Sequence, residues 1–558
     1  TSLTLKVGGM PPVNELSCTQ RTSNTVTLSW GVNNFATGYV IERYSDGKWI
    51  QIANIASNTT VSCKTGSLSA GTAYRFRIKT YNSSSVSSYT YTSVETLPAD
   101  VGNFICTART TNSITLSWSR NTTATGYKLE QYKGGKWVQI AVINGNSTTS
   151  YRVTGLTAAT TYSFRIRAYK TYGNATAHSG YTNLSTLTSP TNVSNVVCVA
   201  RSYNSITLSW NRNTTATGYK LEQYKGGKWV QVAVINGNST TTYKVTGLTA
   251  ATAYSFRIRA YKTSGNATVH SGYTNLSTLT SPTNVSNVVC AARSYNSITL
   301  SWNRNTTATG YKLEQYKGGK WVQIAVINSN STTSYRVTGL TAATAYNFRI
   351  RAYKTSGNAT AHSGYTNLST LTSPTNVSNV TCAARSYNSI TLSWSRNTTA
   401  TGYKLEQYKG GKWVQVAQIN GNNTTSYRVT GLTAATTYSF RIRAYKTSGN
   451  ATAHSGYTNL STLTSPTNVS NVTCAARSYN SITLSWNRNT TATGYKLEQY
   501  KGGKWVQVAA VSGNKNVRCT VSKLSRNTVY RFRIRAYRVI NGKTSNGGYT
   551  YINARTTK

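Results

Sequence analysis

Short runs of alternating apolar and polar residues recur along the whole chain. In residues 114–118 (ITLSW) the apolar side chains stand at every second position, and residues 127–129 and 164–168 repeat this spacing. Clusters of Gly, Asn, Ser and Thr separate the runs, and no run has the spacing of an amphipathic helix. Because a period of two places alternate side chains on opposite faces of a strand, the pattern predicts an all-β chain built from short strands.

The same strand pattern returns at a fixed interval. The segment GYKLEQYKGGKWVQ occurs five times at a spacing of 92 residues, and a diverged copy, GYVIERYSDGKWIQ, begins at Gly38. All seven prolines fall at the borders between copies, where they remove no ladder hydrogen bond from a strand interior. The chain is therefore predicted to be an array of six units. Their predicted bounds are residues 11–97, 98–188, 189–280, 281–372, 373–464 and 465–558.

The first ten residues belong to none of these units. Leu3, Leu5 and Val7 alternate with polar residues, so residues 1–10 are predicted to be an orphan strand or the remnant of a preceding domain. Such a segment could add to the sheet edge of another chain and support self-association into fibres.

Each unit carries the features of a known domain family. Seven or so short strands in about ninety residues favour an antiparallel sandwich. A proline at the start of a unit, Trp118 closing SITLSW, and GLTAATTYSFRIRAY at residues 155–169 resemble the fibronectin type III family. The spacing of Leu156 and Tyr162 resembles that family's tyrosine corner, and the tryptophans that match its core residue are Trp30, Trp118, Trp210, Trp302, Trp394 and Trp486.

The resemblance implies six seven-stranded immunoglobulin-like sandwiches in tandem. If each is about 30 Å long, six in line would form a rod of about 180 Å. The family also implies an extracellular or cell-surface location and no particular ligand, because this fold serves many functions. The Arg-Gly-Asp tripeptide by which some members bind integrins is absent, so that activity is not carried over.

The scarcity of acidic residues argues against catalysis. The chain has ten Asp and Glu, and one repeated strand position supplies six of them: Glu42, Glu130, Glu222, Glu314, Glu406 and Glu498. In the third, fourth and fifth units this glutamate is the only acidic residue, so a two-carboxylate glycosidase site cannot form within such a unit.

The histidines are equally dispersed. They occupy one repeated position, at His178, His270, His362 and His454, so no histidine cluster for a metal can form inside a unit. Phosphate-binding, nucleophile-elbow and dinucleotide motifs are absent from the sequence. We therefore expect no enzyme activity, no catalytic residue, no metal and no cofactor.

Cysteine usage differs between the end units and the middle units. Every unit has a cysteine at one shared position, but only the end units have a second one, 45 residues later. These offsets predict two disulfides, Cys18–Cys63 and Cys474–Cys519, each stabilising its unit by about 4 kcal/mol. The alternative is that all the cysteines are buried thiols that act as small apolar core residues. The intervening strand of the sandwich could also keep each pair apart.

Asn-x-Ser/Thr triplets are frequent and predict glycosylation if the source modifies them. The candidate sites are Asn121, Asn146, Asn192, Asn213, Asn238 and Asn266, and Asn275 is another triplet of the third unit. No signal peptide and no apolar run long enough to span a membrane is present, so a leader and any anchor are expected to have been removed or to lie outside this sequence.

The net charge is the least ordinary feature. Sixty Lys and Arg against ten Asp and Glu give +50, and the third unit alone carries nine basic residues and one acidic residue. Such a charge attracts polyanions. Strand parity places part of it on one outer sheet face, where Glu130 is expected to pair with Arg165 or Arg167. The candidate polyanion or glycan face comprises Lys128, Tyr132, Lys136, Trp137, Arg165, Arg167, Lys220, Tyr224, Trp229, Arg257, Arg259, Trp321, Trp413 and Trp505.

Two interpretations of this face remain open. It is either a surface ladder whose charges and rings satisfy one another or a repeated ligand face whose weak contacts add by avidity. The possible ligands are anionic cell-wall or matrix polymers, neutral glycans stacked on Trp137 and Tyr132, or nonspecifically bound nucleic acid, which is the least favoured.

The sequence thus predicts a non-enzymatic extracellular structural or adhesive protein, a rod-like stalk, spacer or fibre whose basic faces bind anionic polymers weakly. No specific nucleic-acid partner is expected. The alternative is an accessory carbohydrate-binding or spacer region of a larger secreted enzyme.

Overall fold

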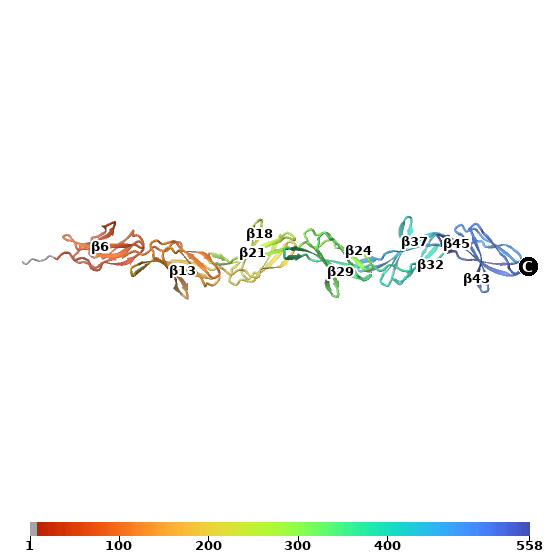
Figure 1. Cartoon of the computed structure of the whole chain (residues 1–558), viewed down its shortest axis with the longest axis horizontal. Coiled ribbons are helices and arrows are strands. Elements are labelled where there is room, and N and C mark those ends of the chain that lie inside the picture. Colours follow the sequence, from red (N-terminus) through yellow and green to blue (C-terminus); the bar gives the residue numbers. More distant parts are fainter. Residues whose placement is uncertain (1–7) are drawn as a thin grey trace, which may run out of the picture. The chain divides into compact units, whose positions relative to one another are not determined.

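The computed structural model describes residues 8–558, so the strand predicted around Leu3, Leu5 and Val7 lies outside the described residues. The described part consists of strands and connecting loops, with no helix among residues 8–558. It divides into two compact units, one reaching to residue 248 and including 252–280, the other comprising 249–251 and 281–558. Each unit contains three of the repeats, and some of their strands are labelled in Figure 1.

The first unit begins with a seven-stranded repeat followed by two eight-stranded repeats. The strands of the first repeat are β1 (Ser17–Arg21), β2 (Val26–Ser29), β3 (Gly38–Ser45), β4 (Lys48–Ile55), β5 (Ser62–Thr65), β6 (Ala73–Tyr81) and β7 (Thr90–Glu95). Those of the second are β8 (Ile105–Arg109), β9 (Ile114–Ser117), β10 (Gly126–Lys133), β11 (Lys136–Asn144), β12 (Ser150–Val153), β13 (Thr161–Tyr172), β14 (Ala175–His178) and β15 (Thr182–Leu187). Those of the third are β16 (Val197–Arg201), β17 (Ser205–Ser209), β18 (Gly218–Lys225), β19 (Lys228–Asn236), β20 (Thr242–Thr246), β21 (Ala253–Ser264), β22 (Ala267–His270) and β23 (Thr274–Leu279).

The second unit repeats the eight-stranded plan three times. Its first repeat has β24 (Val289–Arg293), β25 (Ser297–Ser301), β26 (Gly310–Lys317), β27 (Lys320–Ile327), β28 (Ser334–Thr338), β29 (Ala345–Ser356), β30 (Ala359–His362) and β31 (Thr366–Leu371). The next has β32 (Thr381–Arg385), β33 (Ser389–Ser393), β34 (Gly402–Lys409), β35 (Lys412–Asn420), β36 (Ser426–Thr430), β37 (Thr437–Ser448), β38 (Ala451–His454) and β39 (Thr458–Leu463). The last has β40 (Thr473–Arg477), β41 (Ile482–Ser485), β42 (Gly494–Lys501), β43 (Lys504–Ser512), β44 (Arg518–Val521), β45 (Val529–Ile540), β46 (Lys543–Asn546) and β47 (Thr550–Arg555).

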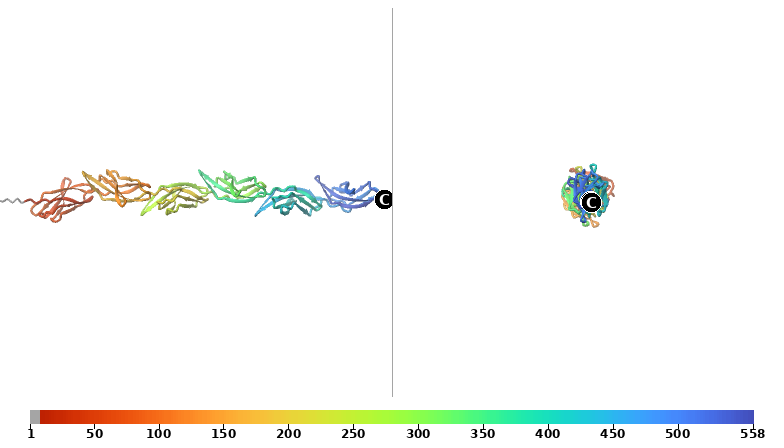
Figure 2. Two further views of the ribbon diagram at one scale, coloured as in Figure 1. Left: turned by 90° about the horizontal axis from the view of Figure 1, so that it is seen from below. Right: turned by 90° about the vertical axis from the view of Figure 1, so that its right-hand side faces the viewer.

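Every repeat packs two antiparallel sheets face to face (Figure 2). In the second repeat the smaller sheet has the order β12-β9-β8, and the larger one has the order β11-β10-β13-β14, with β15 also pairing with β13. The tight turn between β10 and β11 is made by Gly134 and Gly135, which have φ of +54° and +78°. Two successive positive φ values favour glycine and match the twist of a two-residue hairpin. The predicted all-β sandwich is therefore confirmed, but the second to sixth repeats have eight strands and not the predicted seven, because a short strand such as β14 pairs with the end of β13.

The core of each sandwich lies between the two sheets, as the alternating pattern predicts. Trp118 packs edge-on against Tyr127 with ring centroids 5.3 Å apart, and Phe164 is fully buried beside them. Burying one such large side chain contributes about 1.5–3 kcal/mol. The tyrosine corner is also present, because the backbone N–H of Thr157 donates to the hydroxyl of Tyr162 over 2.8 Å.

The predicted disulfides are wrong, since all eight cysteines of the chain are free. Cys18 on β1 lies opposite Leu28 on β2, which in turn lies opposite Cys63 on β5, so a whole strand separates the two thiols. Two strand spacings amount to about 9–10 Å between Cα atoms, whereas a disulfide requires less than about 7 Å. Cys474, Leu484 and Cys519 repeat this arrangement.

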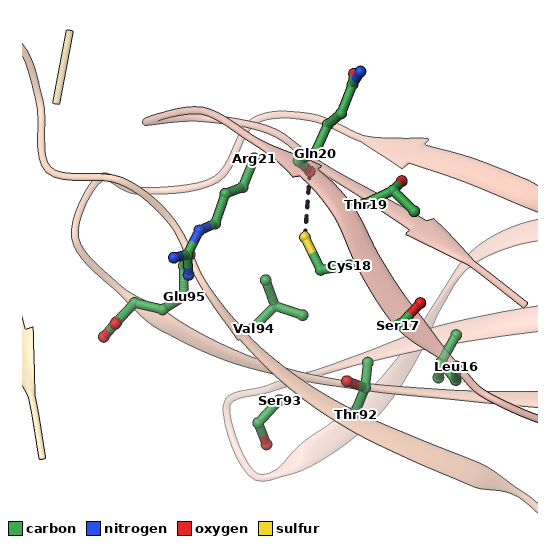
Figure 3. Close-up of a pocket in the computed structure, with 10 residues that line it drawn as sticks. All are labelled: Leu16, Ser17, Cys18, Thr19, Gln20, Arg21, Thr92, Ser93, Val94 and Glu95. Atoms are coloured by element: carbon green, nitrogen blue, oxygen red, sulfur yellow. Dashed lines mark hydrogen bonds between the residues drawn. The ribbon is translucent and has the colours of Figure 1, made fainter. Parts of the chain in front are cut away.

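The end-repeat cysteines instead act as small core residues, which was the alternative interpretation. Cys18 and Cys63 pack against the apolar core of the first repeat. The thiol of Cys18 donates to the carbonyl of Gln20 over 3.3 Å, and Figure 3 shows this contact in the shallow pocket along β1 and β7. Burial raises the pKa of both thiols, so they remain protonated and weakly nucleophilic at neutral pH.

Two of the candidate glycosylation sites are buried structural caps, which contradicts the prediction that they carry glycans. Asn121 is only 8 % exposed; its side-chain amide donates to the carbonyl of Ala99 over 2.6 Å, and its side-chain oxygen accepts the N–H of Thr123. Asn213 is buried in the same way. A glycan is bulky and needs a surface nitrogen, so neither asparagine can carry one in the folded chain.

The remaining candidate asparagines are more accessible. Asn146 and Asn238 are half-buried, and their amides donate to the carbonyls of Ala124 and Thr214. The exposed candidates are Asn192, Asn266 and Asn275. Glycosylation at these positions stays a prediction.

Candidate ligand-binding face

The candidate face is the outer side of the larger sheet in each repeat. In the second repeat Tyr127 and Leu129 of β10 point into the core and are fully buried, so Lys128 and Glu130 lie on the opposite side. On β13, Lys128 lies opposite Arg167 and Glu130 lies opposite Arg165. Strand parity therefore placed these side chains correctly, and the face consists of adjacent cross-strand rows.

The first of these rows, here called the acidic row, consists of Glu130, Arg165, Tyr181 and Trp137. Nε and Nη2 of Arg165 both donate to Oε2 of Glu130, over 2.7 and 2.6 Å, and the hydroxyl of Tyr181 donates to Oε1 over 2.7 Å. The guanidinium carbon of Arg165 stands 3.8 Å from the centroid of the Tyr181 ring and 4.5 Å from that of Trp137. The arginine is thus held between two aromatic rings.

The acidic row is repeated along the chain. The pairs of Arg and Glu are Arg77 with Glu42, Arg165 with Glu130, Arg257 with Glu222, Arg349 with Glu314, Arg441 with Glu406 and Arg533 with Glu498. In every repeat a tyrosine hydroxyl donates to the second carboxylate oxygen. Both oxygens of each glutamate are therefore occupied from within the repeat.

These contacts decide the ionisation of the glutamate. Burial opposes the charged form of Glu130, but the hydrogen bonds from Tyr181 and Arg165, together with the charges of Arg165 and Arg167, outweigh it and lower its pKa. The pKa values of Glu222, Glu314, Glu406 and Glu498 are lowered for the same reasons. A carboxylate that is charged at neutral pH and accepts hydrogen bonds at both oxygens is a counter-ion there and not a proton donor.

The second row, here called the basic row, is the opposed pair Lys128 and Arg167. Arg167 lies over the ring of Tyr181, with 4.7 Å between the guanidinium carbon and the ring centroid. Its buried Nε has no hydrogen-bond partner in the described part of the chain. The other basic rows are Lys220 with Arg259, Lys312 with Arg351, Lys404 with Arg443 and Lys496 with Arg535.

The aromatic residues of the predicted face do not form an open stacking platform. Trp137 is partly buried, with Arg165 over its ring, and it meets Tyr132 edge-on at 5.3 Å between centroids. Trp229, Trp321, Trp413 and Trp505 are covered by arginines in the same way. Tyr132 is 48 % exposed and Tyr224 49 %, and Lys136 is exposed beside the Gly134-Gly135 turn.

Sequence reasoning missed two members of this face. Tyr181 anchors Glu130 from the segment between β14 and β15, and the recurring SGYTN motif could have pointed to it. His178 on β14 lies opposite Tyr169. Burial, followed by the charges of Arg167 and Lys128, lowers the pKa of His178.

Other kinds of site are not apparent in residues 8–558. No group of three or more His, Cys, Asp or Glu in that range could hold a metal ion. The same range, which contains no helix, has no candidate membrane-spanning helix. The chemistry of the face is therefore that of fixed charges and aromatic rings.

Comparison with known proteins gives partial matches to larger proteins. The chain is 30% identical over 321 residues to Exoglucanase B of Cellulomonas fimi, covering 53% of this chain and 28% of that protein. It is 26% identical over 513 residues to receptor-type tyrosine-protein phosphatase eta of Gallus gallus (88% and 34%), and 32% identical over 236 residues to Chitinase A1 of Niallia circulans (40% and 30%). The chain thus spans about a third or less of the length of these relatives.

Family and structure comparisons concern the repeats themselves. A two-domain segment of chicken tenascin matches at 20% identity, covering 32% of this chain and 99% of that one with a TM-score of 0.22. The family model described as the fibronectin type III domain matches residues 11–95, 99–182, 189–273, 281–366, 373–458 and 465–549. These six matches take in most of the sequence, and the chain belongs to the fibronectin type III domain family.

Proposed function

We propose that this chain is a non-enzymatic extracellular spacer whose repeated basic sheet faces bind anionic polymers weakly and many times over. The observation that carries the proposal is that the glutamate of each acidic row is paired within its own repeat. In the third, fourth and fifth repeats the only acidic residue is held by its own arginine and tyrosine. The remaining positive charge has no counter-charge inside the repeat, and repetition every 92 residues suits a polymeric ligand.

The structural half of the proposal is an extended stalk or fibre element. Short linkers that contain proline favour limited motion between neighbouring repeats. Small-angle X-ray scattering of the full chain should give a maximum dimension of about 180 Å, six repeats of about 30 Å each. A compact particle would contradict the stalk.

The binding half is tested by affinity chromatography. The full chain should be retained on immobilised teichoic acid or heparin and should elute at moderate salt, because exposed ionic contacts are screened. It should pass through a column of neutral dextran. Free passage through both anionic columns would reject polyanion binding and leave the spacer function standing.

A second candidate is an accessory region of a larger secreted enzyme. The matches to Exoglucanase B and Chitinase A1, of which the chain covers under a third each, favour it. Co-sedimentation of the full chain with insoluble cellulose and with chitin separates the two candidates. Binding to either neutral polymer supports an accessory carbohydrate-binding role, while absence of binding leaves a spacer. Self-association through residues 1–10 stays a prediction.

A further inference from the structure

The basic row brings two like charges together on neighbouring strands. In the third repeat Lys220 of β18 lies directly opposite Arg259 of β21. Like charges opposed across a strand pair are destabilising, yet the second to sixth repeats all contain this pair. The first repeat has Val40 opposite Lys79 at the same place and therefore lacks it.

The repeat cannot neutralise this pair with its own residues. Glu222 is the only acidic residue of the third repeat. Arg257 occupies its Oε2 at 2.6 Å from Nε, and the hydroxyl of Tyr273 occupies its Oε1 at 2.7 Å. Within 4 Å, only the last repeat joins its basic-row arginine to the carboxylate, with Arg535 at 3.9 Å from Glu498. The charge of the basic row is therefore available to an external anion.

A histidine stands at the end of the same patch. His270 on β22 lies opposite Tyr261, two residues beyond Arg259 on β21 and so on the same side of the sheet. Burial, followed by the charges of Arg259 and Lys220, lowers the pKa of His270. Arg109 of the preceding repeat lines the same cavity as His270. The charged groups that these contacts place near the imidazole, Arg259, Lys220 and Arg109, are all cationic.

We propose that Lys220, Arg259 and His270 form an anion seat for a carboxylate or sulfate group of an acidic polysaccharide. The equivalent seats are Lys128 with Arg167 and His178, Lys312 with Arg351 and His362, and Lys404 with Arg443 and His454. The inference rests on the proposed function and assigns its binding to one position of the face. The acidic-row arginines, the covered tryptophans and the exposed tips of the hairpins are not the binding site.

Anion affinity at the seat should depend on pH, because the seat contains a histidine, whereas the other basic positions of the face are lysines and arginines. A bound anion offsets the charges of Lys220 and Arg259, which removes the electrostatic reason for the lowered pKa of His270. Anion binding and protonation of the histidine therefore favour each other by linkage. Affinity for an acidic polysaccharide should rise as the pH falls from 7 to 5, provided that the polymer stays ionised.

A charge-matched pair of variants tests the seat in the full chain. One variant replaces the seat lysines Lys128, Lys220, Lys312 and Lys404 by glutamine, and the control replaces the exposed lysines Lys133, Lys225, Lys317 and Lys409 at the hairpin tips. Both lose four positive charges. Binding to polygalacturonate, which carries only carboxylates, and to dextran sulfate is measured at one salt concentration.

The seat variant should bind at least tenfold more weakly and the control less than threefold more weakly, because avidity multiplies small losses at each seat. Preference for one polymer identifies the anionic group. Equal losses in both variants would overturn the seat while leaving charge-based binding intact. Failure of the unaltered chain to bind either polymer would reject polyanion binding itself.

A second measurement keeps the seat testable without any polymer. The chain has four histidines, so carbon-13 labelling of their imidazoles gives a spectrum that can be titrated with pH in sodium sulfate and in sodium chloride of equal ionic strength. Sulfate should raise the histidine pKa values in the unaltered chain and in the control, but not in the seat variant. The absence of a sulfate-specific shift in the unaltered chain would refute the seat. Circular dichroism should show all three proteins folded.

Discussion

The acidic row and the basic row use the same kind of arginine in opposite ways. Arg165 and Arg167 stand two residues apart on β13, face the same side of the sheet and lie over the same ring of Tyr181. Arg165 donates hydrogen bonds to the carboxylate of Glu130, whereas Arg167 lies opposite Lys128. Position along one strand thus decides whether an arginine pairs with a carboxylate or lies opposite another cation.

The largest effect should come from removing the carboxylate of the acidic row. Replacing the glutamate by glutamine in all six repeats leaves each arginine between its rings without a counter-charge. We expect a loss of about 2–3 kcal/mol in the free energy of unfolding per repeat, measured by urea denaturation. An unchanged urea midpoint would show that the acidic row does not stabilise the fold.

Acid should weaken the acidic row specifically. Because the folded-state pKa of Glu314 is lowered, its contribution to stability is complete above the ordinary pKa of a glutamate, about 4.3. That contribution is lost as the pH falls through the lower folded value. Urea midpoints measured from pH 5 to pH 2 should fall more steeply for the unaltered chain than for the glutamine variant, and parallel curves would contradict the assignment.

The histidine beside the basic row should act in a higher pH window. Burial and the charges of Arg443, Lys404 and Arg293 lower the pKa of His454 to about 4. In the unfolded chain the histidine has its ordinary pKa of about 6.5 and takes up a proton at a higher pH than in the folded chain. Stability is therefore lost as the pH falls from about 6.5 towards 4. His454→Asn, which copies Asn546 of the last repeat, should remove about 1 kcal/mol or less of this loss because the group is partly exposed. Thermal unfolding at pH 7 and pH 5 gives the comparison.

The smallest expected effect is a gain in the free energy of unfolding. Lys220→Val copies Val40 of the first repeat and removes one of two opposed charges. We expect the free energy of unfolding to rise by about 0.5 kcal/mol at low salt, with the gain fading as salt screens the repulsion. A loss of stability in calorimetry would mean that Lys220 has a stabilising contact of its own.

The alternating pattern predicted the sandwich and much of the face because a strand leaves only two choices of side. Once Tyr127 was placed in the core, Lys128 and Glu130 followed on the outer face, and the pairing of Glu130 with an arginine was confirmed. Tyr181 could not be predicted in the same way, because it comes from a connecting segment that has no fixed parity.

The disulfide predictions and two of the glycosylation predictions failed because sequence spacing does not report strand order or burial. Equal sequence offsets between Cys18 and Cys63 carry no information on the strand that lies between them. The triplet at Asn121 describes a recognition sequence and not the burial of its amide. Both mistakes treated a spacing along the chain as a position in space.

The buried asparagine caps limit the hosts in which this chain can be produced. Asn121 and Asn213 sit in Asn-x-Thr triplets, as do Asn305, Asn397 and Asn489 at the same place in later repeats. A secretory pathway that modifies such triplets before folding would put a sugar where the cap must close on the preceding segment. A host without that modification avoids the conflict.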